Sequence, residues 1–177
     1  KRLHITGNVI ERNNNLRFKG KKRFESAGIK LHTPDHSWIA DNLFRDNFTH
    51  GFWGDEGIGK GLRFTRNVVL GNAESEHGVF IEMGVYGPDT GFIDNNIIIG
   101  NRNGYYCHDG SGVTVSHNLI ANSRNHGIHV QQVGPRCNTR NHSFYNNLLI
   151  GNAKVINLNF PAELGGDVRL NSNVYHA

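Results

Sequence analysis

The stretch "IDNNII" (residues 93–98) places Asn96 with an apolar residue three positions before it and another two positions after it. The same pattern occurs as "ITGNVI" (5–10), "IADNLF" (39–44), "FTRNVV" (64–69), "VSHNLI" (115–120), "FYNNLL" (144–149) and "LNSNVY" (170–175). The seven asparagines are Asn8, Asn42, Asn67, Asn96, Asn118, Asn147 and Asn173, with gaps of 34, 25, 29, 22, 29 and 26 residues. Seven copies in one register indicate an internal repeat.

A second short segment lies between successive copies and usually begins with glycine. Its copies are "GIKLH" (28–32), "GFWGD" (51–55), "GVFIE" (78–82), "GYYCH" (104–108), "GIHVQ" (127–131) and "VINLN" (155–159). Apolar or small residues alternate in these copies, which indicates a half-buried strand rather than a helix. The 22 glycines and 24 asparagines favour many tight turns.

Short strands in a repeat of this length predict a coil whose turns stack on one another and share one core. The aligned asparagines predict an internal ladder, because each side-chain amide can hydrogen-bond to its neighbour and to the adjacent backbone. The chain resembles the right-handed parallel β-helices of carbohydrate-active enzymes. The resemblance implies an all-β, single-stranded right-handed parallel β-helix (solenoid) of about six turns.

Length and composition limit the classes of protein that fit. The 177 residues predict one domain over 1–177, and because the chain begins and ends inside a repeat we expect it to be part of a longer protein. No apolar run is long enough to cross a membrane. The net charge of +4 comes without a basic helix or stripe, so we expect no nucleic-acid partner. Two cysteines cannot form a disulfide framework.

Alternation along the second strand predicts two outward columns of side chains, because successive residues of a strand face opposite sides. The first, called here the aromatic column, contains Lys30, Trp53, Phe80, Tyr106, His129 and Asn157. The second, called here the acid column, contains His32, Asp55, Glu82, His108, Gln131 and Asn159. Three aromatic rings in a row predict a platform for sugar rings. The alternative is a satellite core under a covering loop.

The acid column would bring Asp55 and Glu82 onto adjacent turns. Neighbouring strands are about 4.8 Å apart, so the two carboxyl groups would be about 5 Å apart, the separation found in retaining glycosidases. His32 and His108 flank this pair, and Glu76 and His77 would border the cleft. Three alternatives stay open: a Ca²⁺ site, a structural network neutralised by the histidines, and a register shifted by one residue.

The copies "GFWGD" and "GVFIE", followed by "GPDTGFIDNNII" and "HDGSGVTVSHNLI", resemble those of bacterial β-helix glycoside hydrolases, β-xylosidases among them. The resemblance implies a retaining hydrolase of plant or microbial polysaccharides or oligosaccharides that needs no metal or other cofactor. It assigns Asp55 as the nucleophile and Glu82 as the acid/base. Residues expected to bind substrate are Trp53, Phe80, Tyr106, His32, His108, His129, Gln131 and Lys30. This carbohydrate function favours an extracellular or periplasmic location.

Two other functions fit the same residues. A Ca²⁺-dependent polysaccharide lyase or epimerase acting on uronate polymers would use Lys30, His108 or Tyr106 as the base, with Asp55 and Glu82 holding Ca²⁺. A non-catalytic carbohydrate-binding or structural β-helix segment would use the columns only as a surface. In each case the expected partner is an oligosaccharide or polysaccharide, and unpaired β-helix ends favour self-association or contact with further domains.

Overall fold

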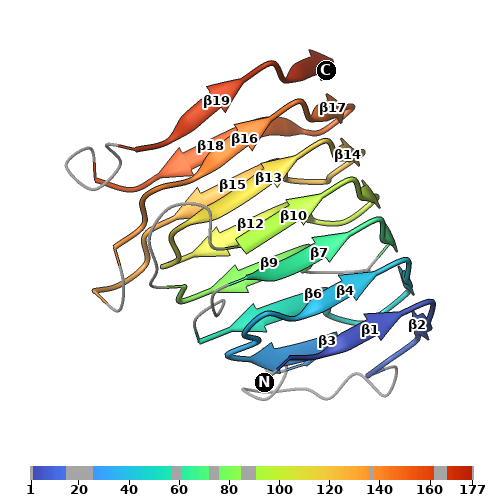
Figure 1. The fold of residues 1–177 in the computed structure, drawn as a ribbon. Coiled ribbons are helices and arrows are strands. Elements are labelled where there is room, and N and C mark those ends of the chain that lie inside the picture. The colour runs from blue at the N-terminus through green and yellow to red at the C-terminus, as the bar shows by residue number, and fades with distance from the viewer. Residues whose placement is uncertain are drawn as a thin grey trace.

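The computed structural model describes residues 2–14, 26–56, 61–71, 76–84, 91–135, 138–161 and 167–176. In these ranges the chain forms a coil of parallel strands without a helix, and the two chain ends lie at opposite ends of the coil (Figure 1). Six successive groups of three strands are followed by β19 and β20. The structure therefore confirms the predicted parallel β-helix. No helix in the described ranges could cross a membrane.

Each strand of a group joins a different sheet, and each sheet grows by one strand per turn. The first sheet contains β1 (His4–Thr6), β4 (Trp38–Ala40), β7 (Leu62–Thr65), β10 (Gly91–Asp94), β13 (Val113–Ser116), β16 (Ser143–Tyr145) and β19 (Arg169–Asn171). The second contains β2 (Val9–Glu11), β5 (Leu43–Arg45), β8 (Val68–Leu70), β11 (Ile97–Ile99), β14 (Leu119–Ala121), β17 (Leu148–Ile150) and β20 (Val174–His176). The third contains β3 (Ala27–His32), β6 (His50–Asp55), β9 (His77–Glu82), β12 (Asn103–His108), β15 (His126–Gln131) and β18 (Lys154–Asn159).

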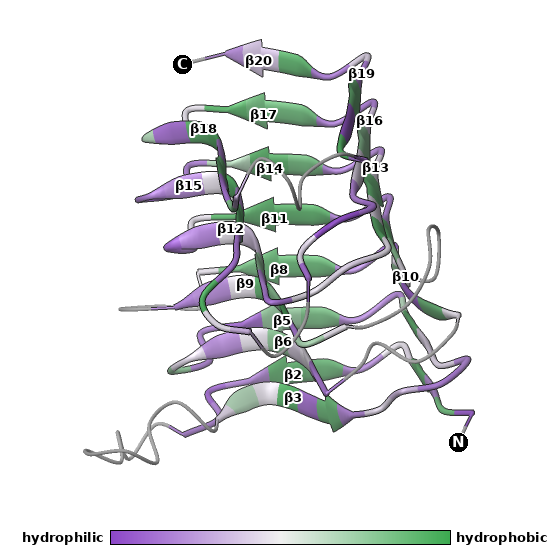
Figure 2. Ribbon diagram, turned by 90° about the vertical axis from the view of Figure 1, so that its left-hand side faces the viewer, coloured by the Kyte–Doolittle hydropathy of each residue, from purple (hydrophilic) through white to green (hydrophobic). Residues whose placement is uncertain are grey.

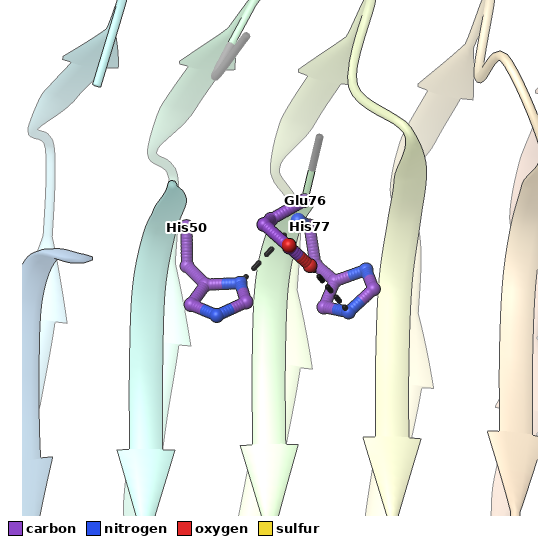
Figure 3. Close-up of side chains that lie close together, drawn as sticks. All are labelled: His50, Glu76 and His77. Carbon is purple, nitrogen blue, oxygen red and sulfur yellow. Dashed lines mark hydrogen bonds and ion pairs between the residues drawn. The ribbon is translucent and has the colours of Figure 1, made fainter. Parts of the chain in front are cut away.

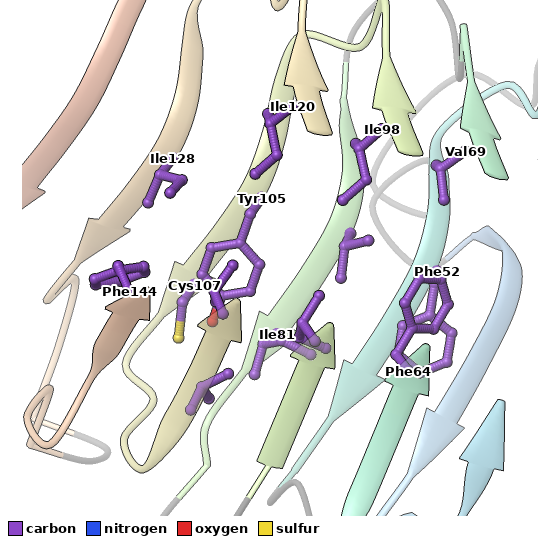
Figure 4. Close-up of a cluster of buried hydrophobic side chains, with 14 of the residues drawn as sticks. Phe52, Phe64, Val69, Ile81, Ile98, Tyr105, Cys107, Ile120, Ile128 and Phe144 are labelled. Atoms are coloured by element: carbon purple, nitrogen blue, oxygen red, sulfur yellow. The ribbon is translucent and has the colours of Figure 1, made fainter. Parts of the chain in front are cut away.

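One apolar core fills the inside of the coil. Each sheet contributes alternate side chains, such as Phe64 from the first, Ile98 from the second and Tyr105 from the third (Figure 4). The strands of the second sheet are mainly hydrophobic, whereas the segments that join them to the other sheets are mostly hydrophilic (Figure 2). Cys107 belongs to this core, and Cys137 lies outside the described residues.

The asparagines of the repeat form the predicted ladder at the corner between the first and second sheets. For example, Asn96 donates from its side-chain amide to Asn118 Oδ1 at 2.9 Å and to the backbone carbonyl of Phe64 at 3.0 Å. The residue directly before each ladder asparagine has a positive φ, as in Asn95 (57°) and His117 (55°). This left-handed residue turns the chain between sheets, and the ladder satisfies the polar groups that the turn buries.

A glycine interrupts the alternation near the start of most strands in the third sheet. A Cβ atom on Gly104 would lie 2.3 Å from Ile120 Cγ2 and 2.8 Å from the carbonyl oxygen of Gly127. Gly28, Gly78 and Gly127 face the equivalent carbonyl on the next turn at 2.6–2.8 Å. The glycine therefore faces the core, as does the residue after it. The residue directly before the glycine consequently faces outward, on the same face as the residue two positions after the glycine.

Candidate functional site

The outer face of the third sheet carries the two predicted columns. The strand register aligns Lys30, Trp53, Phe80, Tyr106, His129 and Asn157 in the aromatic column. In the acid column it aligns His32 with Asp55, and Glu82 with His108, Gln131 and Asn159. The paired residues between β6 and β9 end at Gly54 and Ile81, one position before Asp55 and Glu82.

The aromatic column forms a buried stack rather than an open platform. Trp53, Phe80 and Tyr106 are 5–8% exposed. Trp53 stacks on Phe80 with ring centroids 5.1 Å apart, and Phe80 stacks on Tyr106 at 5.0 Å. Lys30 lies 3.5 Å above the Trp53 ring. The three rings pack together as a small hydrophobic cluster separate from the core of the coil.

The two acids of the acid column make their ion pairs with strands on opposite sides. Asp55 is buried, and its Oδ2 lies 2.9 Å from Lys30 Nζ and 3.5 Å from His32 Nε2, both on β3. Glu82 Oε1 lies 3.7 Å from His108 Nε2 on β12. Each acid is thus paired with a cationic or titratable group on the strand away from the other acid.

A third outward column lies directly before the glycines, and we call it the pre-glycine column. It contains Ala27, His50, His77, Asn103, His126 and Lys154. His50 and His77 stack with ring centroids 5.1 Å apart, and His77 lies 4.1 Å from the Tyr106 ring. Strict alternation places this column inside, so the sequence did not predict it. The dipeptide His-Gly at 50–51, 77–78 and 126–127 was the available signal.

A cavity of about 490 Å³ lies over these columns. Its lining residues are His50, Trp53, Glu76, His77, Phe80, Glu82, Arg102, Asn103, Tyr106, His108, Asn125, His129 and Gln131. Trp53 Nε1 and both ring nitrogens of His129 are buried without a hydrogen-bond partner among the described residues. Gln131 donates a hydrogen bond to the Tyr106 hydroxyl. The structure therefore brings Glu82 and most predicted substrate-binding residues to one cavity, whereas Lys30, His32 and Asp55 do not line it.

Three potential metal ligands converge at one end of the cavity. One donor atom from each of His50, Glu76 and His77 lies within 4.8 Å of the others, and all three residues are buried. His50 and His77 begin β6 and β9, and Glu76 directly precedes β9; the three side chains lie on the same side of the sheet (Figure 3). Glu76 Oε2 lies 3.7 Å from His77 Nε2, and the His77 backbone N–H faces His50 Nδ1 at 3.4 Å.

Burial keeps His50, His77 and His129 uncharged at neutral pH. It lowers the pKa of His50 to about 3, with a further decrease from the Lys30 charge. It lowers the pKa of His77 well below its ordinary value, and the positive charge of Arg102 acts in the same direction. The pKa of His129 falls to about 4 for the same main reason. Neutral imidazoles can accept hydrogen bonds or coordinate a metal ion.

The fold and this cavity define a parallel β-helix protein with an aromatic- and histidine-lined site on one sheet. The sequence profile of a family described as "Periplasmic copper-binding protein (NosD)" matches residues 2–163, so the chain belongs to this family. The description agrees with the extracellular or periplasmic location expected from the sequence. None of the curated proteins and none of the solved structures matches the chain, and the resemblance to β-helix glycoside hydrolases stays a prediction.

The His50–Glu76–His77 cluster fits copper by donor chemistry. Imidazole and carboxylate suit Cu(II) and Zn(II), whereas Cu(I) prefers the sulfur of cysteine or methionine. The described residues that line the cavity carry no sulfur. Sequence reasoning expected no resident metal and named Glu76 and His77 only as residues at the border of the cleft. It missed His50, because strict alternation placed the residue before the glycine inside the coil.

Proposed function

We propose that this chain is a carbohydrate-active β-helix and that the cavity on the third sheet binds a sugar. The observation that carries the proposal is a cavity of about 490 Å³ that combines three stacked aromatic rings with buried polar atoms lacking partners. Pyranose rings place apolar C–H faces against aromatic rings and direct hydroxyl groups to polar atoms at the sides. Trp53 Nε1 and the His129 ring nitrogens would bind those hydroxyl groups, since buried polar groups normally have hydrogen-bond partners.

The proposed reaction is hydrolysis of a glycosidic bond with retention. Glu82, which lines the cavity, would protonate the leaving oxygen. Asp55 lies on the adjacent strand, two positions after Trp53, but does not line the cavity, so the sugar would have to extend past Trp53 for Asp55 to attack the anomeric carbon and form a glycosyl ester. Glu82, now a carboxylate, would then take a proton from water. The resulting hydroxide breaks the ester, which releases the sugar and restores both acids. Lys30 would have to leave its ion pair with Asp55 or adjust it as the ester forms.

A panel of aryl glycosides, aryl β-xylosides included, tests this reaction with EDTA present throughout. Release of the aryl group should fall by about 10²–10⁴-fold in Glu82→Gln, the usual contribution of a general acid, and should reach background in Asp55→Asn. The first-formed sugar should keep the anomeric configuration of the substrate, as observed by proton NMR.

Glu56→Gln is the matched control, because Glu56 is an exposed acid directly after Asp55. It should keep wild-type activity. Equal activity in wild type and Asp55→Asn, or no release from any glycoside, would exclude the hydrolase. Absorbance from an unsaturated product on uronate polymers would identify the lyase alternative. If the protein binds oligosaccharides without cleaving them, and Trp53→Ala abolishes this binding, the chain is a non-catalytic carbohydrate-binding protein.

A second candidate function is periplasmic copper binding, which the family and the His50–Glu76–His77 cluster favour. The two imidazoles and the carboxylate would hold Cu(II) at one end of the cavity. A bound copper ion would supply a Lewis-acidic centre beside the aromatic stack. The two functions share one cavity and can be tested separately, because the metal ligands and the acid column do not overlap.

Titration of the metal-free protein with CuSO4 tests this second function. We expect one Cu(II) per chain by calorimetry, with nitrogen coupling from two imidazoles in the electron paramagnetic resonance spectrum. His50→Gln and His77→Gln should each lose the signal, whereas His117→Gln, at an exposed position in the turn between β13 and β14, should retain it. Unchanged stoichiometry and spectrum in the double variant His50→Gln/His77→Gln would exclude the cluster as the copper site.

A further inference from the structure

Hydrogen bonds along the pre-glycine column connect the candidate metal cluster to the next turns. Asn103 Nδ2 lies 2.9 Å from His77 Nδ1. On the other side of the same amide, Asn103 Oδ1 lies 3.1 Å from the backbone nitrogen of His126 and 3.2 Å from His126 Nδ1. Asn103 is buried between the two histidines, so its amide has one fixed neighbour on each side.

The backbone of β15 determines which way the Asn103 amide faces. The backbone N–H of His126 can only donate, so the Asn103 atom facing it is the carbonyl oxygen. The NH₂ group therefore faces His77 and donates to Nδ1. An imidazole nitrogen that accepts a hydrogen bond carries no proton, so the single ring proton of His77 is on Nε2.

This position of the proton bears on the metal site. His77 Nε2 is the ring nitrogen that faces Glu76, at 3.7 Å. A metal ion at Nε2 needs the lone pair of that nitrogen and moves the ring proton to Nδ1, where metal-binding histidines normally donate to an acceptor. In this chain Nδ1 faces an NH₂ group instead. Asn103 would have to turn its amide over and give up both hydrogen bonds from His126.

We propose that Asn103 is a positioning residue that fixes the ring proton of His77 on Nε2 and thereby weakens Cu(II) binding by the His50–Glu76–His77 cluster. The inference about affinity rests on the proposed copper function, whereas the position of the ring proton does not. The pre-glycine column has histidine on the turns on both sides of Asn103. The asparagine therefore lies between two histidines that are two turns apart.

The substitution Asn103→Asp tests the proposal, because a carboxylate can accept from His126 and from His77 Nδ1–H at the same time. Cu(II) affinity measured by calorimetry at mildly alkaline pH should rise by about 10–100-fold, the usual effect of a partner that orients a metal-binding histidine. Asn125→Asp is the matched control, since Asn125 lines the same cavity and its replacement by Asp adds the same negative charge. It should change the affinity less than threefold, on the order of a single screened charge.

The metal-free protein gives a second, independent measurement. Long-range proton–nitrogen NMR spectra should show His77 protonated on Nε2 in the wild type and on Nδ1 in Asn103→Asp. A wild-type spectrum with the proton on Nδ1 would overturn the inference, as would equal Cu(II) affinities for Asn103→Asp and Asn125→Asp. If the NMR result holds but neither protein binds Cu(II), the copper function fails while the assigned role of Asn103 in orienting His77 stands.

Discussion

Asn96 illustrates how a single residue links its own turn of the coil to the turns before and after it. Its Oδ1 accepts from the backbone and side-chain amides of Asn67 at 2.9 and 3.2 Å, and its Nδ2 donates to the Phe64 carbonyl and to Asn118. All of these groups are buried. No shorter or apolar side chain can make these four bonds, so the repeat needs asparagine at this position.

The substitution Asn96→Ala should lower the free energy of unfolding by about 3–5 kcal/mol, because it leaves several buried polar groups without partners. Denaturant unfolding followed by circular dichroism measures the change. Asn8→Ala is the matched control at the start of the ladder, where the side chain is exposed. It should cost about 1 kcal/mol. A loss for Asn96→Ala no larger than that for Asn8→Ala would contradict the role of the buried ladder.

At the scale of the strand, glycine decides which side chains face outward. The inner face of β12 is crowded at Gly104, where a Cβ atom would lie 2.3 Å from Ile120 Cγ2 and 2.8 Å from a backbone carbonyl. Because the glycine faces the core, Asn103 before it faces the cavity. The same arrangement brings His50 and His77 to the aromatic stack on β6 and β9.

The substitution Gly104→Ala should therefore lower the free energy of unfolding by about 3 kcal/mol or more, since the neighbouring turn cannot move away without breaking sheet hydrogen bonds. Gly54→Ala on β6 is the control, because its added Cβ would lie 3.3 Å from the mobile end of the Ile81 side chain. It should cost about 1 kcal/mol or less. Thermal unfolding of the two variants gives the comparison, and equal losses would show that close packing at Gly104 is not the cause.

The same glycines limited what the sequence could predict. Alternation after the glycine correctly placed Trp53 and Phe80 outside and Ile81 inside, and the spaced asparagines correctly predicted the ladder. Alternation failed one residue before the glycine, because the glycine and the residue after it both face the core. The sequence also does not show how deeply the aromatic column is buried, because that depends on how the side chains of neighbouring turns pack on one another.

At the scale of the whole molecule, the coil is held by contacts between neighbouring turns. In the described part of the chain, every strand pairs only with the equivalent strands one turn before and after it. In such a repeat the stability is approximately a sum over turns and the interfaces between them. The protonation of a buried group in any one turn therefore changes the free energy of unfolding of the whole coil. Four of the described groups are histidines whose pKa is strongly lowered by burial: His50, His77, His129 and His142.

His142 gives the clearest test of acid sensitivity, because it lies in the turn before β16, away from the candidate site. Burial lowers its pKa from 6.5 to about 4, although backbone hydrogen bonds, one of them to Gly110, act in the opposite direction. Between these two values the unfolded chain binds a proton that the folded chain does not. Stability is therefore lost as the pH falls from 6.5 towards 4, by about 3 kcal/mol for this residue.

The substitution His142→Gln removes this titration and can keep the donor to the Gly110 carbonyl, which His142 Nε2 contacts at 2.9 Å. Free energies of unfolding measured by urea denaturation across the acid range should decrease less steeply for His142→Gln than for the wild type. The difference should approach about 3 kcal/mol at the acid end. His117→Gln removes an exposed histidine and should follow the wild-type curve. Parallel curves for wild type and His142→Gln would mean that this imidazole binds a proton equally well in the folded and the unfolded chain.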